Sequence, residues 1–171
     1  MCGIAGFIGS VENPKKLLSS MANAVNHRGP DDLGIWFDES TKTGLAHARL
    51  SILDLSEAGH QPMQSKSGRY FIVFNGEIYN YIEIRKKLET INHRQWRGHS
   101  DTEILLAAIE EWGLFDSLKI VQGMFALALW DRKKNILSLA RDNMGEKPLY
   151  YGWVNNNLVF GSELKAIKEF P

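Results

Sequence analysis

Cys2 is the residue best suited to carry out chemistry, since it follows the initiator methionine and is the only cysteine in the 171 residues. Removal of Met1 is favoured by a small following residue, and it would leave a thiol and a free α-amine on one residue. A thiol attacks as its thiolate and has an ordinary pKa of about 8.5, so it needs a base at neutral pH. The α-amine, with an ordinary pKa of about 7.7–8.0, is a suitable base, as it is for N-terminal threonine nucleophiles. The alternative is a small, inert residue buried in an N-terminal strand.

A second candidate is the polar run Asn75-Gly76-Glu77, which interrupts an apolar segment. Asn-Gly is the strongest short signal for a turn, and that is the simpler interpretation. The functional interpretation is an oxyanion hole, in which a side-chain amide and an approachable backbone N–H stabilise a tetrahedral acyl intermediate. The residues alone leave both open.

Two charged residues also lie in unexpected places. Arg49 stands in a run of small and apolar residues, where its planar guanidinium needs an anionic partner. That partner is either a structural Asp or Glu or a substrate carboxylate. Asp101 follows Ser100 at a predicted helix start, where an acid favours the helix dipole. Its alternative role is to pair with an ammonium group on a ligand.

Composition and motifs exclude several other classes of function. Twenty basic and twenty acidic residues cancel, so nothing predicts nucleic acid or an anionic membrane as a partner. The five histidines lack metal-site spacing, and no phosphate-binding loop is present. No apolar run reaches transmembrane length, and no basic leader precedes the apolar N-terminus. With a single cysteine, these features predict a cytoplasmic protein of one domain over residues 2–171.

The elements that must position these residues are mostly strands in hairpin spacing. Strands are predicted over 2–8, 33–37, 44–53, 69–74, 124–130, 136–140, 149–153 and 158–160. Helices are predicted from Pro14, from Asn80 and Ser100 with capping-box acids at Glu83 and Glu103, and over 163–169, with Gly113 as a helix stop. The hairpin spacing favours antiparallel sheets, and continuously apolar strands indicate burial on both faces. We therefore expect an α+β protein in which two stacked sheets are covered by helices.

Seven motifs appear in order along the chain. They are Met1-Cys-Gly-Ile-Ala-Gly6, His27-Arg-Gly-Pro-Asp31, Ala48-Arg-Leu-Ser-Ile52, Asn75-Gly-Glu-Ile-Tyr-Asn80, Gly98-His-Ser-Asp101, Gln122-Gly-Met-Phe125, and Ala140-Arg-Asp followed by Gly145-Glu-Lys-Pro-Leu-Tyr-Tyr151. With this set the chain resembles the N-terminal glutaminase domain of asparagine synthetase B-type enzymes, which are class II glutamine amidotransferases. The resemblance runs from Cys2 to Lys165 and implies a four-layer αββα sandwich of the N-terminal-nucleophile (Ntn) hydrolase type.

The resemblance also implies a role for each matching residue. Cys2 would attack the side-chain amide of glutamine, and Asn75 and Gly76 would stabilise the oxyanion. Arg49 would hold the substrate α-carboxylate, and Glu77 and Asp101 would hold its α-ammonium. The backbone of Leu50, Ser51, Ile52 and Leu53 would form a wall of the pocket. A glutamyl thioester and ammonia would form, and water would then release glutamate.

One departure from the family pattern is large, because the ATP-dependent synthetase domain is absent from the chain. A fragment, a truncated reading frame and a free-standing subunit are the three explanations. We expect no cofactor in this domain, with ATP and Mg²⁺ confined to the absent one. The expected partners are L-glutamine and a synthetase domain or subunit as ammonia acceptor, and the resemblance allows a homodimer. The rival functions are a non-catalytic glutamine-binding module and a hydrolase of the same fold that acts on another amide.

Overall fold

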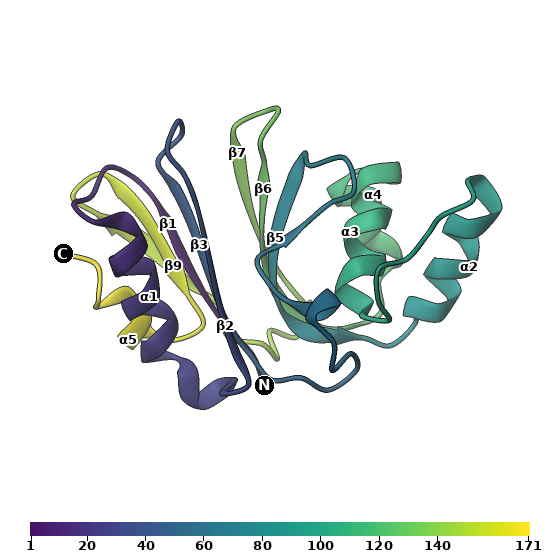
Figure 1. Ribbon diagram of the computed structural model, residues 1–171, viewed down its shortest axis with the longest axis horizontal. Helices are drawn as coiled ribbons and strands as arrows, with labels where there is room; N and C mark the ends of the chain where they lie inside the picture. Colours follow the sequence, from purple (N-terminus) through teal and green to yellow (C-terminus); the bar gives the residue numbers. More distant parts are fainter.

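Two antiparallel sheets face each other at the centre of the computed structural model, which describes residues 1–171. The first sheet has the strand order β2-β3-β1-β9-β8, and the second has the order β4-β5-β6-β7. Helices cover the outer face of each sheet (Figure 1). The predicted four-layer α+β sandwich is therefore confirmed.

The strands of the first sheet are β1 (Gly3–Ile8), β2 (Asp32–Asp38), β3 (Thr43–Arg49), β8 (Tyr150–Val154) and β9 (Asn157–Gly161). Those of the second are β4 (Met63–Gln64), β5 (Tyr70–Ile78), β6 (Gly123–Asp131) and β7 (Ile136–Arg141). The helices are α1 (Pro14–Ala24), α2 (Tyr81–Ile91), α3 (Asp101–Trp112), α4 (Leu114–Ile120) and α5 (Leu164–Ile167), with 3₁₀ turns η1 (Asn26–Arg28) and η2 (Glu57–Gly59).

Three apolar layers hold the sandwich together. Helices α1 and α5 pack on the first sheet through Leu18, Met21 and Ala166. Helix α3 packs on β5 of the second sheet, and α2 packs on α3. Between the sheets lies an apolar layer, the inter-sheet core, formed by Ile4, Leu45, Phe71, Val73, Ala126, Ala128, Trp130 and Phe160.

Strand alternation decides which side chains enter the inter-sheet layer, because successive residues of a strand face opposite sides. On β3, Leu45 enters the inter-sheet core while Ala46 and Ala48 pack toward α1. The row that contains Leu45 then continues through His47 to Arg49. On β5 the row of Phe71 and Val73 continues to Asn75. Each row is apolar at one end and polar at the other.

Strand β1 occupies the middle of its sheet, between β3 and β9. Gly6 permits this close packing, since a Cβ there would lie 2.3 Å from the carbonyl oxygen of Gly44 and 2.5 Å from the Phe160 ring. A side chain at this position would therefore prevent the close approach of β1 to its neighbours.

Several sequence-based boundaries were wrong. Strand β5 does not end at Asn75-Gly76 but runs on to Ile78, because Asn75 pairs with Ala126 and Gly76 with Phe125. Strand β3 ends at Arg49 rather than at residue 53, since the Arg49 guanidinium bonds carbonyls of the loop that follows. Helix α4 was not predicted at all.

The two predicted capping boxes have different outcomes. At α3 the Ser100 hydroxyl accepts the Glu103 N–H at 3.2 Å, and Gly113 ends the helix with φ 85°. At α2 the Asn80 side chain makes no cap. Its amide donates instead to the Ile120 carbonyl at 2.8 Å, and its oxygen accepts the Gln122 N–H at 3.0 Å. Asn80 thus anchors the end of β5 to the segment before β6.

None of the helices combines the length and the apolar composition needed to span a bilayer.

Candidate active site

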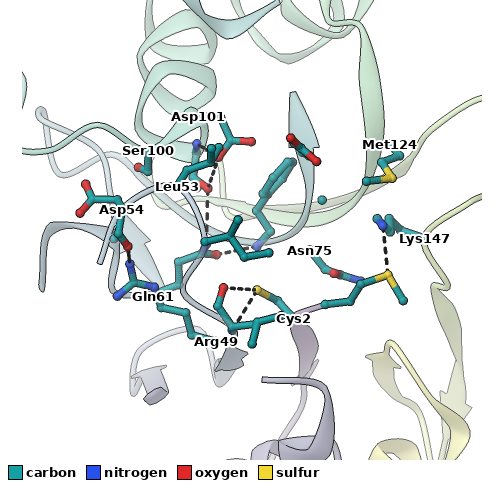
Figure 2. A pocket seen from close by; sticks show the side chains of 18 residues that line it. Cys2, Arg49, Leu53, Asp54, Gln61, Asn75, Ser100, Asp101, Met124 and Lys147 are labelled. Atoms are coloured by element: carbon teal, nitrogen blue, oxygen red, sulfur yellow. Dashed lines mark hydrogen bonds between the residues drawn. The ribbon is translucent and has the colours of Figure 1, made fainter. Parts of the chain in front are cut away.

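A cavity of about 110 Å³ lies where the rows of the inter-sheet layer become polar. Figure 2 shows side chains from both sheets and from the start of α3 converging on it. Of the site residues singled out from the sequence, all but Ser51 line this one cavity: Cys2, Arg49, Leu50, Ile52, Leu53, Asn75, Gly76, Glu77 and Asp101.

Cys2 is half-buried at the start of β1. Its Sγ accepts the Leu50 N–H at 3.4 Å and lies 3.7 Å from the Leu50 carbonyl oxygen. Burial raises the pKa of the Cys2 thiol, and the Leu50 N–H and the positive charges of the N-terminus and Arg49 oppose that rise. The thiol is therefore protonated at neutral pH and needs a base before it attacks.

The backbone of Cys2 is fixed by Arg28, which belongs to η1. Its Nε donates to the Cys2 carbonyl at 3.0 Å, and its Nη1 donates to Glu163 at 2.9 Å. Although burial acts in the opposite direction, hydrogen bonds from Arg28, Lys165 and His27 lower the pKa of Glu163 to about 2. Residues from both ends of the domain thus hold the cysteine in place.

Asn75 and Gly76 present hydrogen-bond donors without acceptors. Asn75 is 1% exposed, and its side-chain nitrogen Nδ2 has no hydrogen-bond partner. The N–H groups of Phe74 and Ile78 bond side chains outside the β5–β6 ladder, and alternation turns the Gly76 N–H to that same side. A Cβ on Gly76 would lie 2.3 Å from the Met124 carbonyl oxygen, so only glycine fits. The turn interpretation of Asn-Gly was wrong, and the donors required of an oxyanion hole are present.

Arg49 is 8% exposed, and no carboxylate lies within 4.0 Å of it. Its Nη1 donates to the Ser56 carbonyl at 3.1 Å, and its Nη2 donates to the Asp54 carbonyl. These backbone bonds hold the guanidinium at the cavity wall and leave its positive charge unpaired. Of the two alternatives, the structural Asp or Glu partner is therefore absent.

Asp101 and Glu77 supply negative charge at the same cavity. Asp101 is 5% exposed, and its carboxylate accepts the Ile78 N–H at 2.9 Å and the Thr102 N–H at 2.8 Å. Burial raises the pKa of Asp101, as does the charge of Glu77, while the two hydrogen bonds lower it. Glu77 is exposed. The unpaired guanidinium of Arg49 and the carboxylates of Asp101 and Glu77 place charges of both signs at the cavity, and this suits a zwitterionic ligand such as an amino acid.

The loop after β3 closes one wall of the cavity. Leu50, Ile52 and Leu53 all line it, and Ile52 and Leu53 are 70% and 42% exposed. The loop therefore borders the cavity on a side that is open to solvent.

Sequence reasoning assigned no role in the site to several residues that line the cavity or support it, Ser100 having been predicted only as a helix cap: Arg28, His47, Asp54, Gln61, Ser100, Thr102, Met124 and Lys147. Arg28 and Lys147 lie within motifs that were recognised, so motif membership was the available signal. His47 and Gln61 carry no such local signal, because their contacts join segments far apart in the chain. No group of three or more His, Cys, Asp or Glu residues is arranged to hold a metal ion.

Comparisons with a family model and with individual known proteins point to the same family. A family model described as a glutamine amidotransferase domain matches residues 1–171. Asparagine synthetase (glutamine-hydrolysing) 3 of Bacillus subtilis (strain 168) is 39% identical, over 100% of this chain and 28% of its own length. Asparagine synthetase (glutamine-hydrolysing) 2 of the same organism is 41% identical, over 100% of this chain and 23% of its own length. The chain thus spans less than a third of the length of these relatives.

A solved structure confirms the fold. Glutamine phosphoribosylpyrophosphate amidotransferase from B. subtilis, complexed with ADP and GMP, superposes with a TM-score of 0.84 at 22% identity. The match covers 98% of this chain and 43% of that structure. At this identity the likeness concerns the architecture alone, and it agrees with the two stacked sheets found here.

Proposed function

We propose that this chain, which belongs to the family of glutamine amidotransferase domains, hydrolyses the side-chain amide of L-glutamine through a thioester on Cys2. The observation that carries the proposal is the unpartnered Nδ2 of Asn75, buried in the same cavity as the Cys2 thiol. A buried amide without an acceptor costs about 1–3 kcal/mol, and an oxyanion formed at Cys2 would remove that cost.

Charge complementarity supports glutamine as the substrate. Its α-carboxylate would meet the unpaired guanidinium of Arg49, and its α-ammonium would meet Asp101 and Glu77. With both ends held, the side-chain amide extends toward Cys2. Holding the two reactants in this way supplies much of the rate of an acyl transfer.

The chemical steps begin once Met1 has been removed. The free α-amine of Cys2 takes the thiol proton as sulfur bonds the amide carbon, and Asn75 and Gly76 bind the resulting oxyanion. The amine then gives its proton to the leaving nitrogen, the carbon–nitrogen bond breaks, and ammonia departs. Water adds to the thioester with the amine again accepting a proton, and breakage of the carbon–sulfur bond releases glutamate and the thiol.

We assign the ammonia to a synthetase domain or subunit, on the ground that the similar B. subtilis proteins are named asparagine synthetases and are more than three times as long as the aligned chain. ATP and Mg²⁺ would serve that synthetase, and we assign no cofactor to this domain. The unpaired Cys2 thiol suits a reducing compartment, and we place the reaction in the cytoplasm.

The test is ammonia release from L-glutamine, with L-asparagine as a second amide, by protein whose Met1 status is known from its intact mass. Processed protein should release ammonia from glutamine, and acid quenching should trap a glutamyl adduct on the N-terminal residue. Cys2→Ala should lower the rate by at least about 10³-fold while leaving glutamine binding intact. Absence of ammonia from processed protein, with and without a synthetase partner, would contradict the proposal.

A further inference from the structure

Strand β5 lacks a neighbouring strand beside the segment that carries Asn75. Strand β4 pairs only with Ile72 and Phe71, so the backbone of Phe74 would be bare on that edge. Two side chains replace the missing strand. Gln61 Oε1 accepts the Phe74 N–H at 2.7 Å, and His47 Nε2 lies 3.1 Å from the Phe74 carbonyl oxygen.

We infer that His47 and Gln61 are positioning residues that hold the oxyanion-binding segment Asn75-Gly76 in place relative to Cys2; the inference rests on the proposed function. Phe74 directly precedes Asn75, and its carbonyl shares a rigid peptide plane with the Asn75 nitrogen. A bond that fixes the Phe74 carbonyl therefore fixes the start of the donor segment.

His47 comes from the sheet that carries the nucleophile. It lies on β3 directly opposite Ile4 of β1, two residues after Cys2. Its bond to Phe74 therefore crosses from the Cys2 sheet to the Asn75 sheet, through a layer that is otherwise apolar at its core. This cross-sheet bond fixes the position of the oxyanion donors relative to the nucleophile. Apolar packing alone is not directional and would fix that position less precisely.

The His47 bond is a neutral one. A carbonyl only accepts, so Nε2 carries the proton and donates. Burial lowers the pKa of His47 to about 4, with the Phe74 carbonyl acting against that shift and the nearby charge of Arg49 adding to it. Because the ring is 1% exposed, water does not compete for the bond, and the ring stays neutral throughout the physiological range.

Gln61 extends the tie to the substrate-binding side. It is 5% exposed, and its Nε2 donates to the Thr102 hydroxyl at 3.4 Å. Thr102 adjoins Asp101, whose carboxylate accepts the Ile78 N–H further along β5. Side chains thus occupy the β5 edge at Phe74 and at Ile78, and the Gly76 N–H between them is left for the oxyanion.

The expected signature is a loss of transition-state stabilisation. A misplacement of about 1 Å can cost roughly 10²-fold in rate. His47→Leu and Gln61→Leu should each lower kcat for glutamine hydrolysis by about 10- to 100-fold and leave KM within about threefold. Inhibition by the aldehyde analogue of glutamine, which adds to the thiol and places an oxygen in the oxyanion hole, should weaken by the same factor as kcat/KM falls. Alkylation of Cys2 by iodoacetamide should keep its rate.

The matched control is Asn80→Ala, which removes side-chain hydrogen bonds just after the end of the same strand, beyond the donor segment. It should lower the unfolding temperature without changing the aldehyde affinity. If His47→Leu fails to fold, the same comparison is made with His47→Gln and Gln61→Leu. Because His47→Gln retains an N–H at the ε position, it should retain more activity than Gln61→Leu.

Asn75→Ala, measured in parallel, separates the two proposals. If Asn75→Ala leaves kcat unchanged, the oxyanion hole of the proposed function is wrong. Suppose instead that Asn75→Ala lowers kcat. The positioning role is then overturned if His47→Leu and Gln61→Leu keep both kcat and aldehyde affinity. It is also overturned if these two variants lose no more aldehyde affinity than Asn80→Ala does.

Discussion

The two ends of the inter-sheet layer are built from the same strands and the same alternating rows, yet they do different things. One end is the apolar inter-sheet core, in which Leu45, Val73 and Ala126 are fully buried. At the other end the rows continue into His47, Arg49 and Asn75, which line or support the cavity. Within one layer, therefore, stability and chemistry are divided along the length of the strands.

The difference extends to how polar atoms are treated. At the cavity end Arg49 and Asp101 bond backbone groups, whereas Nδ2 of Asn75 and Nη2 of Arg28 have no partner. At the apolar end Nε1 of Trp130 also lacks a partner. Asn75 is a residue that lines the cavity, whereas Trp130 is enclosed by packed side chains. Of these two, we assign a role in the proposed reaction to Asn75 only.

The largest expected effect is on catalysis at the cavity end. Asn75→Ala should lower kcat for glutamine hydrolysis by about 10²–10³-fold, because one of two oxyanion donors is lost. Its unfolding temperature should stay the same or rise, since the amide that disappears has no partner in the folded protein. Steady-state kinetics and thermal unfolding measure the two quantities. A lower unfolding temperature with unchanged kcat would reverse the roles assigned to the two ends.

The converse effect is expected at the apolar end. Leu45→Ala empties a fully buried site, and it should lower the free energy of unfolding by about 3 kcal/mol while changing kcat by less than about twofold. Urea denaturation at 25 °C gives the first value and ammonia release the second. Leu164→Ala is the matched control, because that side chain is 56% exposed and should cost less than about 0.5 kcal/mol. Equal losses in the two variants would contradict the assignment.

Acid should weaken the protein at the junction of the two ends. The unfolded chain protonates His47 near its ordinary pKa of 6.5, whereas the folded chain does so only near pH 4. The contribution of neutral His47 is therefore complete above pH 6.5 and is lost as pH falls toward 4, with a total of about 3 kcal/mol. Urea midpoints of wild type and His47→Gln should converge over this range. Glu163, whose pKa is lowered from 4.5 to about 2, acts in a more acidic window and should leave the difference intact.

The smallest expected effect concerns the helix that borders the cavity. Ser100→Ala removes the N-cap of α3 and should lower the free energy of unfolding by about 1 kcal/mol. Because Asp101 keeps its bonds from Ile78 and Thr102, KM for glutamine should change by less than about threefold. Urea denaturation and steady-state kinetics test both statements. A large rise in KM would mean that the cap, rather than the strand, positions Asp101.

Sequence patterns predicted the layers well, because hydrophobic alternation and hairpin spacing are local signals. They failed where a distant partner overrides a local preference. Asn75-Gly76 has the composition of a turn, but pairing with Ala126 and Phe125 keeps it in a strand. His47 was one of five unremarkable histidines in the sequence. Its role depends on a bond to Phe74, 27 residues away, that exists only after two sheets have packed.

The candidate site shows the same division. Cys2, Arg49 and Asn75 were singled out because each is chemically unusual in its local sequence, whereas Asp101 also suits a helix start and gained its site role from the motif resemblance. The structure places them around one cavity, while their proposed roles await experiment. The supporting residues were missed, since a buried Gln61 resembles any other polar loop residue until its hydrogen-bond donor, the Phe74 N–H, is known.

The place of β1 between β3 and β9 also determines the order in which its two neighbouring strands become available during synthesis. One neighbour of the cysteine strand, β3, follows it closely in the sequence, whereas the other, Asn157–Gly161, lies far along the chain and is synthesised much later. Contacts of such long sequence separation form late in folding. During synthesis β1 therefore lacks its second neighbouring strand until the β8–β9 hairpin has been made, and this interval would leave the N-terminus open to an aminopeptidase.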